Sequence, residues 1–520
     1  MREGSGARLR GRPAGALVPL FSVPSHRSWG IGEIPDLVPL GRWLQSAAMG
    51  FVQLLPVNEM QEGQSSPYSA LSAMAIDPIF ISLSSLPGPA VEPAPGERAL
   101  LQEAREAPAI RYGAVRAAKG AGLRRAFASY DRGEWHGGSP DHHSLRQFCE
   151  EQAWWLDDYV LFRALHEHYH RRHWQEWDPP LRDREPAALR EARERFARSI
   201  RYYEWLQWLA HEQWQRMRRE APVAILGDFP FMVSGHSADV WSRQDEFRID
   251  VSVGVPPDAF SETGQDWGLP LYRWDVISAR GDEWLRLRAR RCADLYDGFR
   301  IDHLVGFYRT FFRTAEGEQF FDPPDQPAQQ AQGERLLRVF AEPGARLIAE
   351  DLGVVPDFVR ASIGELGIPG LKVFRWEREW DLDGHPFRNP AEYPAVSVAV
   401  SSTHDTESLA DWWDGADADE REAALDVPGL RGRPFTPASA YSPEVRDALL
   451  DVLYAARSGL LILPLQDIFG WRDRINTPAL VSDENWTWRL PWAVEDLSEV
   501  PDALERARFL RGLAAKHDRL

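Results

Sequence analysis

Gly298-Phe-Arg-Ile-Asp-His303 is a short apolar run that ends abruptly in charged residues. Seven further runs of this kind occur along the chain, and such continuous apolar runs are typical of parallel strands buried on both faces. Helical patterns separate many of them, for example Asp36–Ser46, Glu283–Leu295 and Val445–Ala456. The sequence therefore predicts an α/β fold, a (β/α)8 TIM barrel. The predicted strands are Ala16–Leu20, Phe51–Val57, Val223–Phe231, Gly298–Leu304, Arg346–Leu352, Leu371–Trp376, Val396–Thr403 and Leu460–Ile468.

Two connections are far longer than a barrel requires, which predicts large inserted subdomains. A Pro- and Gln-rich segment from Asp322 to Gly333 is predicted to be a loop. No separate C-terminal β domain is expected. The predicted division is residues 1–57 for the start of the catalytic barrel, 58–220 for a largely helical insertion, 221–231 for the third strand, 232–297 for an insertion with an active-site loop, and 298–520 for the rest of the barrel.

Composition and charge narrow the class of partner. The 520 residues are 44% hydrophobic and carry a formal charge of -18, a field that repels phosphate backbones, so nucleic acid is not expected as a partner. Only Cys149 and Cys292 occur, too few for a disulfide framework, which favours a reducing compartment. The 22 tryptophans suit either a packed core or sugar rings, which stack on aromatic faces.

The N-terminus resembles a secretion signal only superficially. Basic residues at Arg8, Arg10 and Arg12 precede an apolar stretch from Ala14 to Val23, but Pro19 and Pro24 interrupt it and it lacks a clear cleavage site. No run reaches the roughly 18 apolar residues that a membrane span needs. We therefore expect a cytoplasmic protein without a membrane partner.

Three predicted strands end in carboxylates. They carry Asp302 after the fourth strand, Glu350 and Asp351 after the fifth, and Asp405 after the seventh. A barrel brings these ends to one face. Gathered carboxylates are what cleavage or transfer of a glycosidic bond requires, namely a nucleophile, a proton donor and a partner for an oxocarbenium-like transition state.

Ordinary structural roles are open for the same residues. Asp302 could be an ion partner of Arg300, two residues away on the same face of the strand. Glu350 and Asp351 point in opposite directions, so only one can face the barrel axis, and Asp351 could cap a helix. His404 and Asp405 could form a capped turn or hydrogen-bond sugar hydroxyls.

A second motif suggests different chemistry. His166-Glu-His-Tyr-His170 matches the H-E-x-x-H pattern of zinc proteases. The residues that follow offer no third ligand, and a catalytic zinc needs three protein ligands. We expect a solvated, His-rich helix face, no metal site and no cofactor.

The chain also resembles a known family, the amylomaltases or disproportionating enzymes, which are 4-α-glucanotransferases of glycoside hydrolase family 77. The shared motifs run almost end to end: Gly30-Ile-Gly-Glu33, Leu55-Pro-Val57, Ser66-Pro-Tyr68, Gly227-Asp228, Gly254-Val-Pro-Pro-Asp-Ala-Phe-Ser261, Gly264-Gln-Asp-Trp-Gly268, Arg300-Ile-Asp-His303, Ala349-Glu-Asp-Leu-Gly353, Thr403-His-Asp405, Gln466-Asp467, Asn476-Thr-Pro478 and Asn485-Trp-Thr-Trp-Arg489.

The resemblance implies a role for each catalytic carboxylate. Asp302 would be the nucleophile that forms a covalent glycosyl-enzyme, Glu350 the general acid and base, and Asp405 the stabiliser of the transition state. The Gly264–Gly268 segment would be a loop over the active site that presents Trp267 to the glucan. The remaining substrate-binding residues that it implies are Tyr68, Asp228, Arg300, His303, His404 and Asn476.

The implied substrates are α-1,4-glucans, with glucose or maltooligosaccharides as acceptors. The sequence departs from the family pattern at Leu304-Val305, at Leu269 and at Thr406-Glu-Ser408, so it leaves the acceptor preference open. Two alternatives also stay open at this stage. One is a hydrolase, because the same carboxylates can pass the glycosyl group to water. The other is a catalytically silent glucan-binding scaffold.

Overall fold

The computed structural model describes residue 9 and residues 11–88, 90–133, 142–256, 264–478, 480 and 482–520. Its centre is a closed barrel of eight strands in which every neighbouring pair is parallel. Each strand lies beside the next barrel strand of the chain, and the last closes onto the first. This confirms the predicted TIM barrel. The strands are β1 Ala14–Leu17, β2 Phe51–Gln53, β3 Ala224–Phe229, β6 Gly298–Ile301, β9 Arg346–Ala349, β10 Gly370–Val373, β11 Ser397–Val400 and β12 Leu460–Pro464.

All eight predicted strands occur, but each of them ends earlier than predicted. The predicted fifth strand, for example, runs to Leu352, whereas β9 ends at Ala349. The residues beyond Ala349 leave the ladder and turn over the barrel mouth, where Glu350 and Asp351 bind neighbouring backbone groups. Apolar patterning continues through these turns because they are packed against the core, so it overestimates the length of the ladder.

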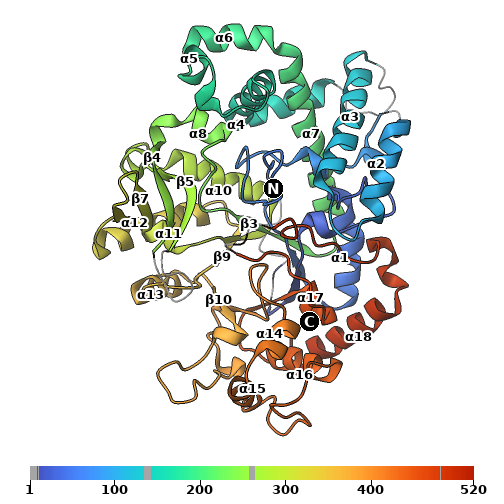
Figure 1. The fold of residues 1–520 in the computed structure, drawn as a ribbon, viewed down its shortest axis with the longest axis vertical. Coiled ribbons are helices and arrows are strands. Elements are labelled where there is room, and N and C mark those ends of the chain that lie inside the picture. Colours follow the sequence, from blue (N-terminus) through green and yellow to red (C-terminus); the bar gives the residue numbers. More distant parts are fainter. Residues whose placement is uncertain are drawn as a thin grey trace.

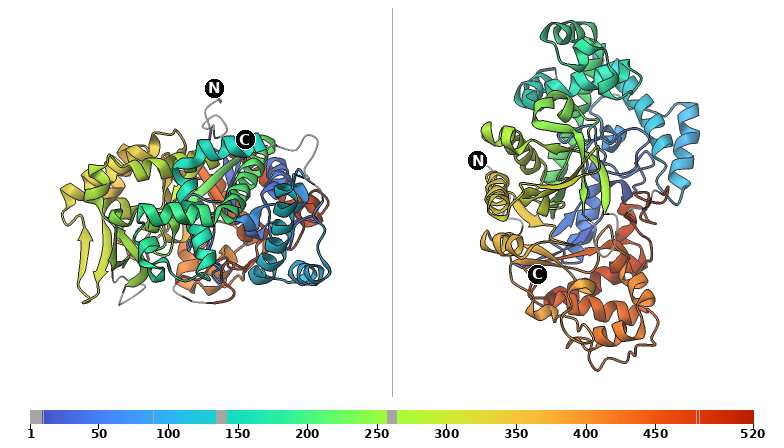
Figure 2. Two further views of the ribbon diagram at one scale, coloured as in Figure 1. Left: turned by 90° about the horizontal axis from the view of Figure 1, so that it is seen from above. Right: turned by 60° about the vertical axis from the view of Figure 1, so that its left-hand side comes forward.

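Helices cover the outside of the barrel (Figures 1 and 2). The predicted helices at Asp36–Ser46, Glu283–Leu295 and Val445–Ala456 correspond to α1, α10 and α16, with ends within two residues. The longer helices that follow or separate the strands are α1 Leu37–Ser46, α10 Glu283–Leu295, α12 Gln326–Ala341, α13 Asp357–Glu365, α14 Leu409–Gly415, α15 Ala418–Leu425, α16 Pro443–Tyr454 and α18 Pro501–Lys516.

The connection from β2 to β3 is largely helical. In Figure 1 its helices form the upper part of the molecule and the right-hand flank, next to the barrel. The long helices α4 and α7 pack against each other, and α7 carries buried Trp205, Trp208 and Trp214 toward the interior. The helices are α2 Pro95–Glu106, α3 Tyr112–Asp131, α4 His142–His168, α5 Pro179–Arg182, α6 Pro186–Arg195 and α7 Ala197–Glu220.

A second, antiparallel sheet lies beside the barrel, at the left of Figure 1. Its strand order is β5-β4-β7-β8, so it joins segments from both sides of β6 in the sequence. Short helices α8, α9 and α11 border these strands. The elements are α8 Ala238–Ser242, β4 Phe247–Val255, β5 Gln265–Tyr272, α9 Trp274–Ala279, α11 Val305–Tyr308, β7 Thr310–Thr314 and β8 Gln319–Asp322.

Two predicted loops are regular structure instead. The Asp322–Gly333 loop is wrong beyond its first residues, because α12 starts at Gln326 with Asp325 as its N-cap, whose side chain accepts a hydrogen bond from the Ala328 N–H. Most of the Gly264–Gly268 segment belongs to β5. The Pro257 to Ser261 part of the predicted Gly254–Ser261 motif lies outside the described residues.

Most tryptophans are core residues, which is the first of the two roles that the sequence left open for them. Among those described, most are buried, and Trp174, Trp205, Trp208, Trp214, Trp241 and Trp413 are almost completely so. No helix in the described part of the chain combines the length and the apolar character that crossing a bilayer demands.

Candidate active site

Three carboxylates follow the C-terminal ends of β6, β9 and β11, as predicted. In the parallel pairing of β6 with β9, Ile301 is opposite Ala349. The next residues, Asp302 and Glu350, are therefore level with each other at the barrel mouth. Backbone hydrogen bonds continue this register, because the Glu350 N–H donates to the Ile301 carbonyl over 3.1 Å and the Leu304 N–H donates to the Glu350 carbonyl over 3.2 Å.

Asp302 is held by an arginine that binds two carboxylates. Arg300 donates through one guanidinium nitrogen to Asp302 Oδ1 over 2.7 Å, and through the other to both oxygens of Asp228 over 2.7 and 2.8 Å. Arg300 and Asp228 are buried, whereas the Asp302 side chain keeps 29% of its surface exposed. The ion pair proposed as an alternative role for Asp302 is thus present. It also orients a carboxylate that water and substrate can reach.

Asp302 and Glu350 both have raised pKa values. Burial raises the pKa of Asp302 to about 6, an effect that Arg300 opposes and that the negative charges of Asp228 and Asp405 reinforce. Burial raises the pKa of Glu350 to about 7, again against Arg300 and with Asp302 in support. Glu350 therefore holds a proton at a higher pH than Asp302 does.

The backbone fixes the Glu350 carboxylate. One oxygen accepts the His303 N–H over 2.8 Å and the other accepts the Leu352 N–H over 3.1 Å. The first bond requires a left-handed turn at His303, where φ is +45°, an uncommon conformation for a residue with a side chain. Non-glycine residues in such conformations gather at functional sites, where the surrounding structure holds them in place.

Asp405 has the opposite electrostatic character. It accepts a hydrogen bond from Asn476 Nδ2 over 2.6 Å and lies 3.2 Å from His404 Nε2. Burial alone would raise its pKa, but the charge and hydrogen bond of His404, together with Asn476, lower it to about 2. In the same pair, burial would lower the pKa of His404, and Asp405 overcomes it and raises that pKa. Asp405 is therefore a permanent anion.

Tyr68 links the two halves of this network. Its hydroxyl donates to Asp228 Oδ2 over 2.6 Å and lies 3.0 Å from His404 Nε2. The ring of Tyr68 stacks on that of His404 at 5.9 Å and packs against Trp486 at 5.7 Å. Because the Tyr68 hydroxyl donates its proton to Asp228, the hydroxyl oxygen can accept a hydrogen bond from His404.

Trp267 reaches the same site from the neighbouring sheet. Its ring lies edge-on to the ring of His303 at 4.9 Å, and its indole N–H donates to Gln265 Oε1 over 3.2 Å. The loop expected at residues 264–268 is mostly strand β5 instead, and Trp267 lies where the register with β4 shifts, between Asp266 and Leu269. The structure thus brings all ten predicted site residues to one end of the barrel.

Asp467 is a residue of this region to which the sequence assigned no role. It is completely buried, and its Oδ2 accepts hydrogen bonds from the hydroxyls of Ser401 and Ser402, each over 2.5 Å. Its Oδ1 accepts the Leu409 N–H over 2.7 Å. Asp467 therefore ties together both ends of the turn that carries Asp405. The Gln466-Asp467 motif was the signal available in the sequence.

Asp351 has a structural role, but not the one expected. It caps no helix, since α13 begins later with Pro356 as its N-cap. Instead its Oδ1 accepts the Leu371 N–H over 2.7 Å and so fastens β9 to β10. A side chain on Gly370 would meet Asp351 Oδ2 at 2.5 Å, so a glycine is needed there.

The zinc-protease pattern does not form a zinc-protease site. Helix α4 ends at His168, so His170 lies beyond the helix, in a turn with φ of +53°. The expected solvated face is wrong for His166, which is buried with its Nε2 3.0 Å from His236 Nε2. Burial lowers the pKa of His166 to about 3. Within the described ranges, no group of three or more His, Cys, Asp or Glu side chains could hold a metal ion.

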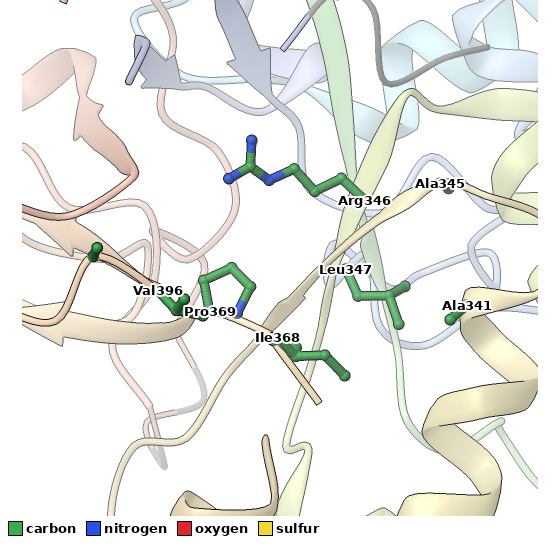
Figure 3. A pocket seen from close by; sticks show the side chains of 9 residues that line it. Ala341, Ala345, Arg346, Leu347, Ile368, Pro369 and Val396 are labelled. Atoms are coloured by element: carbon green, nitrogen blue, oxygen red, sulfur yellow. The ribbon is translucent and has the colours of Figure 1, made fainter. Parts of the chain in front are cut away.

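A cavity of about 260 Å³ lies at the other end of the barrel (Figure 3). It is formed where β9, β10 and β11 begin, and its lining includes Arg346, Leu347, Ile368 and Val396. Catalytic groups of this fold follow the C-terminal ends of the strands. This cavity is therefore not the active site.

Comparison with known proteins agrees with the geometry. Residues 18–495 match the family model described as 4-alpha-glucanotransferase, of glycoside hydrolase family 77. The 4-alpha-glucanotransferase of Thermus thermophilus is 34% identical over 514 residues, which cover 92% of this chain and 95% of the relative. That of Chlamydia muridarum is 32% identical over 501 residues, covering 93% and 92%.

Solved structures support the same fold. The amylomaltase from Streptococcus agalactiae in complex with acarbose has a TM-score of 0.80 at 24% identity, over 98% of this chain and 99% of that one. The amylomaltase from Corynebacterium glutamicum has a TM-score of 0.81 at 22% identity, over 97% and 76%. With the family match along nearly the whole chain, these findings show that the chain belongs to glycoside hydrolase family 77, and it is a 4-alpha-glucanotransferase that transfers segments of α-1,4-glucan.

Proposed function

We propose that this chain transfers glucan by a retaining double displacement in which Asp302 is the nucleophile, Glu350 the general acid and base, and Asp405 the stabiliser of the transition state. The observation that carries the proposal is the contrast among the three carboxylates. Glu350 is poised to hold a proton near pH 7, Asp405 stays ionised, and Asp302 is oriented by Arg300 with part of its surface exposed. Carboxyl groups that are pushed apart in pKa mark separate acid and base roles.

In the first step, Asp302 attacks C1 of the donor sugar, and the bond from C1 to the glycosidic oxygen breaks. Glu350 delivers its proton to that oxygen, and the remainder of the glucan leaves. In the second step, the ionised Glu350 takes the proton of an acceptor 4-hydroxyl, which attacks C1 and releases Asp302. Two inversions at C1 retain the α configuration. No metal or cofactor takes part in either step.

The surrounding residues support these steps in two ways. Tyr68, His303, His404 and Asn476 line the donor sugar, while Trp267 contacts the acceptor glucan. Asp228 and Arg300 mainly position Asp302 and Tyr68, because both are buried within their own ion pair. Acceptors are glucose or maltooligosaccharides. We assign the barrel to residues 1–57, 221–231 and 298–520, with insertions at 58–220 and 232–297 that shape its mouth.

A trapping experiment tests the nucleophile. Maltotriosyl fluoride has a good leaving group, so Glu350→Gln should still form the bond between C1 and Asp302 as fluoride departs. Without its base, the variant should then release the adduct slowly. Peptide mass spectrometry should find one maltotriosyl group on the peptide that contains Asp302. An adduct on another carboxylate, or none in a folded variant that consumes the fluoride, contradicts the assignment.

A further inference from the structure

Trp380 differs from the other tryptophans of this protein. Among the described tryptophans it is the one that is largely exposed, with 55% of its surface in water. Leu382, two residues later, is 56% exposed. Single exposed apolar residues are ordinary on a protein surface, but an indole of this size is a large apolar group to leave in water.

The Trp380 segment is an ordered hairpin. Arg378 forms a β-bridge with Phe387, the Glu379 N–H donates to the Pro386 carbonyl over 2.9 Å, and the Arg388 N–H donates to that of Glu377 over 2.8 Å. Gly384 at φ +74° and His385 at φ +42° make the turn. The hairpin thus presents Trp380 and Leu382 on a fixed backbone.

The Arg378 guanidinium packs against the indole of Trp380. The Arg378 guanidinium carbon lies 5.1 Å from the centre of the Trp380 ring and 4.7 Å from that of Phe387. Arg378 Nε donates to the His385 carbonyl over 2.7 Å, and its Nη1 lies 3.4 Å from Glu420 Oε1. The Arg378 side chain is only 10% exposed. Trp380 is therefore held by Arg378 and by the His385 ring, whose centre lies 5.4 Å from that of the indole, while more than half of its surface stays accessible.

The hairpin belongs to the catalytic end of the barrel. It follows β10 and the short helix Phe374–Trp376, and β10 lies between the strands that lead to Glu350 and Asp405. Just before the hairpin, Arg375 forms an ion pair with Glu407, two residues beyond Asp405. A glucan that leaves the catalytic carboxylates toward β10 therefore meets this hairpin on the same rim.

We propose that Trp380 is a stacking platform for a distant part of an α-1,4-glucan, outside the sugars held at the catalytic carboxylates. The inference rests on the glucan specificity of the family. A sugar ring offers C–H groups to an aromatic face and hydroxyls to nearby acceptors. The exposed side chains of Asp381 and Asp383 supply such acceptors and disfavour anionic ligands. The platform favours long glucans over short ones.

The test compares substrate lengths. Trp380→Ala should lower kcat/KM for amylose relative to maltotriose by about two- to tenfold, the effect of one lost stacking contact. Trp380→Tyr should keep most of the wild-type ratio because it retains an aromatic face. Leu382→Ala is the matched control, since it removes an equally exposed apolar side chain from the same hairpin without removing a ring.

The possible outcomes separate this inference from the proposed mechanism. An unchanged amylose-to-maltotriose ratio in Trp380→Ala overturns the platform, as does an equal loss for both substrates or an equal effect of Leu382→Ala. A binding measurement adds a second readout, namely retardation of Glu350→Gln in native gels that contain amylose, which Trp380→Ala should reduce. If the wild-type protein transfers no glucan at all, the proposed function fails instead.

Discussion

Arg300 and Asp228 are paired in both backbone and side chain. They are opposite each other in the register of β6 and β3, and Arg300 donates to both carboxylate oxygens of Asp228. Desolvation works against the charge of Arg300, but Asp228 and Asp302 outweigh it and raise the pKa of Arg300 well above its ordinary value. This buried pair is the support on which the orientation of Asp302 depends.

Asp228→Asn should therefore damage both stability and catalysis. Removing one partner of a buried ion pair costs about 3–5 kcal/mol of unfolding free energy. Because Asp302 still pairs with Arg300, the loss should lie toward the lower end of that range. The glucan-transfer rate should fall with it, because Arg300 loses its anchor. Denaturant unfolding and maltotriose disproportionation measure the two effects. The control is Asp250→Asn, which breaks the exposed ion pair with Arg248 and should lower the unfolding free energy by less than about 1 kcal/mol. Similar losses of unfolding free energy in both variants would refute the role of Asp228.

The pH dependence of kcat/KM should be bell-shaped with a maximum between about 6 and 7. Activity falls as the pH drops through the pKa of Asp302, because a protonated carboxyl cannot attack. It falls as the pH rises through the pKa of Glu350, because the acid has lost its proton. The apparent pKa values of the two limbs describe Asp302 and Glu350 as an interacting pair. With maltotriosyl fluoride, the alkaline limb for adduct formation should vanish in Glu350→Gln, and its persistence would rule out Glu350 as the acid.

Asp467 should act as a positioning residue for Asp405. Asp467→Ala frees both ends of the Asp405 turn, and a displacement of about 1 Å in a catalytic group can cost about 100-fold in rate. The loss should appear mainly in kcat. Asp297→Asn is the control, because it also alters a buried carboxylate that binds strand backbone, at the start of β6. If both variants lose stability alone and keep kcat, Asp467 serves only the fold.

Trp267→Ala should change what intercepts the glycosyl-enzyme. We expect the ring, packed on His303, to hold the acceptor glucan and to limit the access of water. Wild-type enzyme given maltotriose should release glucose and build longer chains with little gain in reducing ends. The variant should yield more reducing ends per glucose released, by about two- to tenfold if one stacking contact is lost. An unchanged ratio with lower turnover would restrict Trp267 to binding the donor.

Chelation should leave activity intact. Each catalytic carboxylate is already bound by protein groups: Asp302 by Arg300, Glu350 by two backbone N–H groups, and Asp405 by Asn476 and His404. Dialysis against EDTA followed by a glucose-release assay checks this expectation. If EDTA abolishes activity and added zinc restores it, the enzyme needs a metal, and the histidines around His166 become candidate ligands.

Much of the barrel could be predicted because its strands are continuous apolar runs, and the motifs at their ends identify the carboxylates. The elements that could not be predicted depend on long-range contacts. Glu350 and Asp351 are adjacent in sequence, yet only the structure shows that Asp351 binds Leu371 on the next strand. In the same way, the family resemblance placed Trp267 on a loop, whereas the structure has it in β5, at a shift in the register with β4 between Asp266 and Leu269.

The antiparallel sheet limits how this enzyme can be rebuilt by exchange of segments. Strands β4 and β5 precede Asp302 in the chain and β7 and β8 follow it, yet all four form one sheet. A graft of residues 232–297 from a relative would import half of that sheet and leave its partner strands behind. Chimeras should therefore exchange residues 232–322 as one cassette, which moves the nucleophile-bearing strand together with the sheet beside it.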